Sequence, residues 1–308
     1  MASGIGTTYY DWYPPGSIRE DLMDFIAQIT PTDRPFMTMI GDSKASSIDH
    51  QWLRRDIAGR QDNAFIEGSV FGFTANINIP VRERNIVQIF EKEVAVSEEA
   101  NLVDRAGISD QYSDQVQIRF TELLMDEEHT LLRGSLSTAG TGSARRLKGL
   151  FFAISAGSNV CFATGMTLTE TNLNDFFARQ WQLGVRPRDS LVNAGLKRRI
   201  SGFTTTSTPR FRDQNDLSIV NVVTIYESDF GVVEFQLSRD VPEVSSTVTA
   251  STGFLVIFDR EYYKKAWLRP ITTRRTADRS DSIEGVVIGS ATLEYGHPSA
   301  GGLLFGLL

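Results

Sequence analysis

The strongest helical signal in the chain is ISDQYSDQVQIRFTELLMDEEHTLLR, residues Ile108 to Arg133. Large apolar side chains recur along it at Ile108, Tyr112, Val116, Phe120, Leu123, Leu124, Leu131 and Leu132. This spacing predicts one amphipathic helix, because residues three or four apart share a helix face. About 26 residues at about 1.5 Å each would span about 39 Å, enough to brace a whole domain. Ser109 is the expected N-cap and Gly134 the expected stop.

The composition around this helix is that of a chain with a large hydrophobic core. Of 308 residues, 41% are hydrophobic and 22% are charged, which excludes a disordered or fibrous protein. The single cysteine, Cys161, excludes an internal disulfide, so a reducing compartment is expected. The net charge of -7 lacks the basic footprint of a dedicated nucleic-acid binder. Residues 149–169 carry no charge but hold too many polar residues for a membrane span, so no membrane partner is expected.

Before the helix, two alternating segments enclose a long polar connection. Residues 46–55 and 84–96 alternate apolar and polar side chains and are expected to be strands. The connection between them carries isolated glycines and aromatics, namely Gly59, Gly68, Gly72, Phe65, Phe71 and Phe73. A connection of this length in a compact domain is usually either functional or disordered. Because its aromatic residues argue against disorder, we interpret it as a functional loop.

After the helix, the chain mixes helices and strands. Residues 134–149 are rich in Gly, Ser and Thr and are interpreted as a linker, after which Leu150–Ile154 returns to the core. Helices are expected at 169–183 and 190–202, and strands at 217–226, 230–237, 254–258 and 283–295. The expected fold class is therefore α+β.

No constellation of catalytic or metal-ligating residues emerges from the sequence. None of His50, His129 and His297 has another His or Cys at an offset of three or four residues. The acidic runs around 91–99 and 126–128 are typical of solvated faces or ion pairs. We therefore expect no enzyme, no catalytic residue, no metal and no cofactor. The alternative, an enzyme, would need a pocket that joins His129 to nearby carboxylates.

Several segments have no visible partner within one subunit. They are an aromatic N-terminal arm with Tyr9, Tyr10 and Trp12, the long excursion, and an apolar tail from Leu303 to Leu308. Isolated two-stranded ribbons are marginal in water and apolar ends favour association, so we expect contacts in an assembly.

Basic side chains gather at Arg145, Arg146 and Lys148, at Lys197, Arg198 and Arg199, and at Arg274, Arg275 and Arg279. Phosphates and the carboxylates of a neighbouring subunit are both suitable partners for them, so a DNA-facing and an inter-subunit role stay open.

The order of arm, hairpin excursion, long helix, mixed second lobe and returning strands resembles the major capsid proteins of tailed phages, which share the Hong Kong 97 fold. Motifs along nearly the whole chain are similar to one family of phage major head proteins. They are REDL (19–22), ITPTDRPF (29–36), MIG (39–41), HQW (50–52), EG (67–68), QIF (88–90), VAVS (94–97), LTETNL (168–173), VNAGLKRRIS (192–201) and IYESDFG (225–231).

This resemblance implies four structural parts. Residues 1–45 would be an N-terminal arm and 46–96 an extended β-hairpin loop laid over a neighbour. Residues 97–149 and 253–308 would form a peripheral domain that contains the spine helix, and 150–252 an axial domain.

The resemblance also implies that the chain self-assembles into pentamers and hexamers of an icosahedral virion shell around double-stranded DNA. Assembly would occur in the bacterial cytoplasm, with a portal protein and decoration or scaffolding proteins as further partners. Expected inter-subunit contacts on the extended loop are Trp52, Arg54, Arg55, Phe65, Glu67, Phe71, Phe73, Arg82 and Arg84, and on the arm Tyr9, Tyr10 and Trp12.

Two further expectations concern this shell. Some relatives crosslink a Lys of the extended loop to an Asn of the next subunit, but no Lys occurs between Lys44 and Lys92, so no such crosslink is expected. The alternative function is the shell of an encapsulin-like compartment that encloses cargo enzymes.

Overall fold

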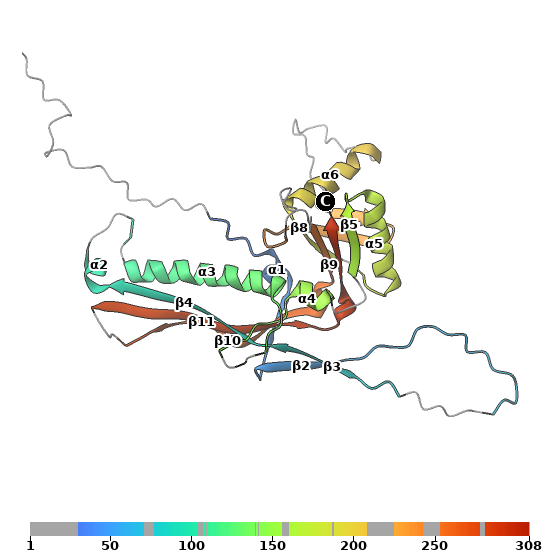
Figure 1. The fold of residues 1–308 in the computed structure, drawn as a ribbon, viewed down its shortest axis with the longest axis horizontal. Helices are drawn as coiled ribbons and strands as arrows, with labels where there is room; N and C mark the ends of the chain where they lie inside the picture. Colours follow the sequence, from blue (N-terminus) through green and yellow to red (C-terminus); the bar gives the residue numbers. More distant parts are fainter. Residues whose placement is uncertain are drawn as a thin grey trace, which may run out of the picture.

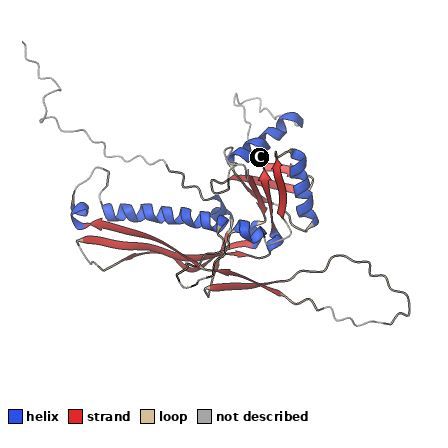
Figure 2. Cartoon of the chain, in the orientation of Figure 1, coloured by secondary structure: helices blue, strands red, loops and turns tan. Residues whose placement is uncertain are grey.

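The subunit is elongated, with two bodies and a long excursion (Figure 1). The computed structural model describes residues 30–70, 77–103, 107–108, 110–138, 140, 142–155, 160–186, 188–207, 225–242, 253–277 and 281–307. One body is a four-stranded sheet backed by a long helix, and the other is a six-stranded sheet with helices beside it (Figure 2). The expected α+β class is confirmed.

The four-stranded sheet joins strands from distant parts of the chain. Its order is β1-β10-β11-β4, with β1 Gly41–Lys44, β10 Tyr263–Arg275, β11 Ser282–Tyr295 and β4 Gln88–Ser97. β10 and β4 both pair antiparallel with β11, while β1 pairs parallel with β10. Helix α3 packs on one face of this sheet, where the side chains of Phe90 and Val94 are buried. The short helix α2 (Glu98–Leu102) follows β4.

The predicted spine helix is α3, Gln111–Arg133, which begins three residues later than expected. Its N-cap is Asp110, whose carboxylate accepts the amide of Tyr112 at 3.2 Å, while the expected cap, Ser109, lies outside the described residues. Gly134 ends the helix as predicted. Its φ of -54° needs no glycine, but a Cβ there would lie 2.6 Å from the carbonyl oxygen of Thr130. Close packing therefore explains this glycine.

The six-stranded sheet has the order β5-β12-β9-β6-β8-β7. Its strands are β5 Val160–Met166, β12 Gly301–Leu307, β9 Gly253–Phe258, β6 Asp189–Val192, β8 Gly231–Leu237 and β7 Ile225–Ser228. Helices α5 (Glu170–Gln182) and α6 (Ala194–Ser207) contribute Phe177 and Leu196 to a core against it. The helix expected at 190–202 is thus wrong in its first part, because 189–192 is a buried central strand.

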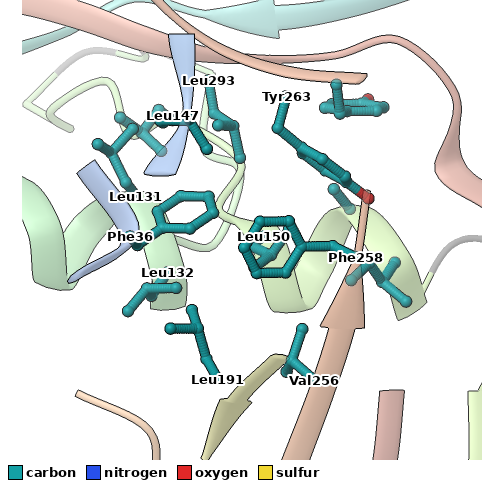
Figure 3. Packing of buried hydrophobic residues seen from close by; sticks show 14 of the residues in the cluster. Phe36, Leu131, Leu132, Leu147, Leu150, Leu191, Val256, Phe258, Tyr263 and Leu293 are labelled. Carbon is teal, nitrogen blue, oxygen red and sulfur yellow. The ribbon is translucent and has the colours of Figure 1, made fainter. Parts of the chain in front are cut away.

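A continuous core joins the two bodies. Figure 3 shows Phe36 and Leu150 between the aromatic rings of Phe258 and Tyr263 and the leucines at the end of α3. Phe36 belongs to α1 (Pro35–Met39), and Leu150 begins α4 (Leu150–Ser155). The Phe36 and Phe258 rings meet edge to face with centroids 5.5 Å apart, an arrangement favoured by ring quadrupoles. Residues 34–40 were expected to belong to an arm that buries few side chains, but Phe36 and Ile40 are buried in this core.

The strand pairing differs from the predicted division of the chain in two places. Residues 88–96, assigned to the extended loop, form β4 inside the four-stranded sheet. Residues 253–258 and 301–307, assigned to the peripheral domain, form β9 and β12 near the middle of the six-stranded sheet. We expected the apolar tail that begins at Leu303 to contact a neighbouring subunit. Its described part, residues 303–307, instead lies inside its own subunit, because β12 pairs with both β5 and β9.

The excursion leaves the body as a two-stranded hairpin, β2 (Asp49–Arg54) and β3 (Val81–Ile86). The segment between them projects well beyond the rest of the subunit (Figure 1). Two short 3-10 turns, η1 (Arg260–Tyr262) and η2 (Pro298–Ala300), form corners beside β10 and β12. Among the helices described, none is both long and apolar enough to cross a bilayer.

Candidate assembly interface

The base of the excursion is firmly attached to the body. Asn85 is fully buried, and its amide donates to the carbonyl oxygens of Lys148 at 2.9 Å and Leu293 at 2.7 Å. Its side-chain oxygen accepts the amides of Lys148 and Ile86, both at 2.8 Å. All four hydrogen-bonding positions of this amide are used, so the end of β3 is tied to both the 134–149 connection and β11.

Trp52 lies at this base rather than on a free surface. Its ring meets Tyr295 edge to face, with centroids 4.8 Å apart. The hydroxyl of Tyr295 in turn accepts the ammonium of Lys148 at 2.9 Å, and this ammonium lies 4.7 Å from the centroid of the tyrosine ring. Trp52, expected as an inter-subunit contact, therefore packs mainly within its own subunit.

Charged side chains surround the same base. Arg54 donates through Nε to Glu83 at 2.7 Å and through Nη1 to Asp56 at 2.7 Å. Asp56 also contacts Nε2 of His297 at 2.5 Å. The hydrogen bond from His297, together with the positive charge of Arg54, lowers the pKa of Asp56 from its usual value. Arg54 is thus satisfied inside its own subunit.

Beyond the base, the described residues of the loop are exposed. Phe65 is 80% exposed and Ile66 84%, values that a lone subunit rarely tolerates for neighbouring apolar side chains. Other large apolar residues of the excursion are exposed as well: Ile57, Val70, Ile77, Ile79 and Val81. Glu67 is exposed beside them. These side chains form an apolar surface that no described part of the subunit covers.

The three arginines among the expected contacts that are not tied at the base, Arg55, Arg82 and Arg84, are exposed, as is Arg60. Arg84 approaches Asp49 only at 3.9 Å, so most of its charge faces solvent. The remaining expected contacts, Phe71, Phe73, Tyr9, Tyr10 and Trp12, lie outside the described residues.

The four-stranded sheet offers a second open surface. In antiparallel pairs, opposite residues point to the same side, so Glu91 with Ile288 and Glu93 with Val286 share the face away from α3. On the next strand, Arg274 lies opposite Val286 on this face. The outer face, as we name it, thus carries an acidic row on β4 beside an apolar row on β11.

The expected basic residues occupy different environments. Lys148 is only 9% exposed, and burial lowers the pKa of its ammonium, so it faces neither DNA nor a neighbour. The prediction that Lys148 faces DNA or a neighbouring subunit is therefore wrong, because its long aliphatic side chain packs inward against Tyr295. Arg145 is half-buried, whereas Arg146, Arg274 and Arg275 are exposed. Arg279 lies outside the described residues.

The structure reveals two buried carboxylates at the end of the spine helix. Glu127 and Glu128 were interpreted as part of a solvated acidic run, but both are fully buried at the end of α3. Glu128 accepts the amides of Phe36 and Met37, each at 2.8 Å. Burial raises the pKa of each carboxyl to about 7. The helical spacing did carry a signal for this, because Glu127 and Glu128 lie four residues after Leu123 and Leu124 and four residues before Leu131 and Leu132, on the apolar face itself.

The hollow that the enzyme alternative needs is present, because His129, Asp126 and Glu91 line one pocket. The His129 ring is exposed, however, and its Nδ1 pairs with Asp240 at 3.0 Å, a residue that is not among those lining the pocket. Within the described ranges, no three His, Cys, Asp or Glu side chains come together in a way that could hold a metal.

The architecture defines the fold class, which is the Hong Kong 97 capsid fold. The capsid protein of cyanophage A-1(L) is similar, with a TM-score of 0.68 and 12% identity over 96% of this chain and 98% of that chain. The capsid protein of Myoviridae phage XM1 has a TM-score of 0.63 and 14% identity, over 96% of this chain and 100% of that chain. The SrpI encapsulin of Synechococcus elongatus PCC 7942 has a TM-score of 0.61 and 11% identity, over 94% of this chain and 92% of that chain.

The family is defined by sequence. The model of the SU10 major capsid protein family matches residues 2–308, so this chain belongs to that family. Its members are structural proteins and not enzymes. The major capsid protein of Escherichia phage Phieco32 is 26% identical over 132 residues, a region that covers 42% of this chain and 37% of that protein.

Proposed function

We propose that the chain is the subunit of an icosahedral virion shell, built from pentamers and hexamers, that encloses phage double-stranded DNA. The observation that carries this proposal is the exposed apolar loop, which extends far from a well-packed body. A monomer gains nothing from such a loop, whereas a closed symmetric assembly repeats each modest contact many times. The family and the fold support the same role.

The loop would lie on the outer face of a neighbouring subunit. Exposed arginines of the excursion, Arg55, Arg82 and Arg84 among them, complement the acidic row formed by Glu91 and Glu93. Its apolar side chains, Phe65 and Ile66 among them, complement the row formed by Val286 and Ile288. Such complementary charges chiefly give an interface its specificity and register, while apolar burial supplies most of the affinity.

The strand pairing supports a revised division into domains. The peripheral domain would comprise 88–149 together with 259–300, and the axial domain 150–258 together with 301–307. Residues 41–44 would join the peripheral sheet as β1, and the extended loop proper would be 46–86. The axial domains would surround the capsomer axis.

DNA would be held by confinement and diffuse charge, in keeping with the net charge of -7, because tight binding of phosphates would oppose packaging and release. A portal protein, decoration or scaffolding proteins and assembly in the host cytoplasm belong to the same proposal.

An enclosed compartment that carries cargo enzymes is the second candidate, because the SrpI encapsulin shares the fold. The test is electron microscopy and light scattering of the expressed chain, followed by nuclease treatment of particles from infected cells. Closed shells with nuclease-protected DNA are expected. Particles that contain an enzyme and no DNA would favour the second candidate, and monomers under all conditions, with no shells in infected cells, would overturn both.

A further inference from the structure

A polar cluster closes the base of the extended loop, and we call its four residues, Arg54, Asp56, Glu83 and His297, the root clamp. They come from the end of β2, the first residues of the loop, β3 and the corner between β11 and η2. Arg54 holds Glu83 on one side and Asp56 on the other, each at 2.7 Å. Asp56 bridges Arg54 to His297, so the clamp joins both sides of the hairpin to the body.

The position of the histidine proton follows from its contacts. Nδ1 of His297 accepts the amide of Ser299 at 2.9 Å, which caps η2. A ring nitrogen that accepts an amide hydrogen carries no proton of its own, so the neutral ring holds its proton on Nε2 and donates it to Asp56. The 3.2 Å approach of Arg54 to the same Nε2 is then a contact between two donors, and Asp56 is the group that holds both.

The loop has little other support beyond the clamp. Residues 57–70 and 77–79 are exposed throughout, and the side chain of Asn78 donates to the backbone oxygen of Asp56 itself. About 12 extended residues reach about 40 Å, so a rotation of about 10° at the base moves the tip by about 7 Å. Small changes at the clamp are therefore amplified at the surface that would meet a neighbour.

We propose that the root clamp is a positioning device that sets the direction in which the extended loop leaves the subunit, and thereby the geometry with which the loop meets a second copy of the chain. Its role in shell geometry rests on the proposed function, whereas its role in loop direction does not. Asp56 is the central group, because its carboxylate accepts hydrogen bonds from both Arg54 and His297. It lies on the exposed loop, so its substitution leaves the core intact.

The first test measures loop direction in the isolated subunit. Spin labels at Ser69→Cys, 13 residues beyond Asp56, and at Gln117→Cys, in a Cys161→Ser background, report the distance from the far part of the loop to α3. In Asp56→Asn or Asp56→Ala, the mean is expected to shift, or the distribution to broaden, by about 7 Å or more. The matched control, Asp62→Asn, removes the same charge farther along the loop and should leave the distribution unchanged. Unchanged distributions in both Asp56 variants would overturn the proposal.

A second measurement tests the link to assembly. By electron microscopy, the Asp56 variants should yield open or mixed-size particles, while Asp62→Asn and wild type yield uniform shells. His297→Gln, which retains a side-chain donor, should assemble more uniformly than His297→Ala. If wild type forms no shells under any condition, infected cells included, the proposed function fails while the distance measurement still decides the clamp. Uniform shells from the Asp56 variants would overturn its role in shell geometry.

Discussion

Glu128 in α3 accepts the backbone amide of Phe36 at 2.8 Å across 92 residues of sequence, and thereby fixes the start of α1 on the spine helix. Its second oxygen accepts the amide of Met37. The adjacent Glu127 is equally buried, yet neither of its carboxylate oxygens has a hydrogen-bond partner among the described residues. The junction between the N-terminal segment and the four-stranded sheet therefore contains two carboxyl groups that differ sharply in how they are satisfied.

These carboxyls predict that the fold gains stability on mild acidification. Burial raises the pKa of Glu127 from 4.5 to about 7, and the attraction of Lys265 offsets this only in part, while Asp42 and Glu128 add to it. A folded pKa above the unfolded value means that the ionised form opposes folding. Stability from this group is full below pH 4.5 and falls as the pH rises to about 7, by on the order of 3 kcal/mol.

Glu127→Gln should therefore be more stable than wild type at pH 8 and similar to it at pH 5. Chemical denaturation at both pH values measures the difference. Glu91→Gln, an exposed site on β4, is the control and should follow wild type. A variant with the same pH profile as wild type would contradict the ionisable role of Glu127.

Replacing two exposed apolar side chains of the loop should abolish assembly without unfolding the subunit. Phe65→Ser with Ile66→Ser changes two exposed side chains, so the stability should change by less than about 0.5 kcal/mol for each. Light scattering should show that shells no longer form, and circular dichroism that the fold is unchanged. Leu237→Ser, an exposed apolar residue on β8, is the control. Normal shells from the double variant would argue against the loop as an assembly element.

Charge reversal should identify the surface that receives the loop. Glu91→Lys with Glu93→Lys should prevent shell formation, because the exposed arginines of the incoming loop would meet like charge. Adding Arg82→Glu and Arg84→Glu to the same chain should restore it, since every subunit supplies both surfaces. Added salt should weaken assembly of both wild type and the restored variant. If the variant with all four substitutions keeps its fold but does not assemble, the loop binds a surface other than the outer face.

Assembled particles should dissociate completely in denaturant. The chain has no Lys between Lys44 and Lys92, so the excursion lacks the amine needed for a lysine-to-asparagine crosslink. A denaturing gel of purified shells should show one band near 34.3 kDa. A ladder of covalent multimers would contradict this expectation.

Local patterns in the sequence predicted the parts of the fold that depend on near neighbours. The spine helix follows from apolar residues spaced within a few turns, and its end at Gly134 from the residue type. The excursion was visible as two alternating segments around a long connection. In each case the residues that specify the element lie inside it, so the prediction needed no knowledge of the rest of the chain.

The sequence by itself therefore determined the helix, the excursion and, through the order of its motifs, the family. Only the tertiary structure decided which sheet each strand joins, as when the chain end at 301–307 enters the middle of the six-stranded sheet. It also decided that Glu127, Glu128 and Lys148 are buried and that His297 meets Asp56, a residue 241 positions away. The physical reason is that strand partners and the burial of polar groups depend on contacts between distant segments, whereas periodicity within one segment shows only which of its residues share a face.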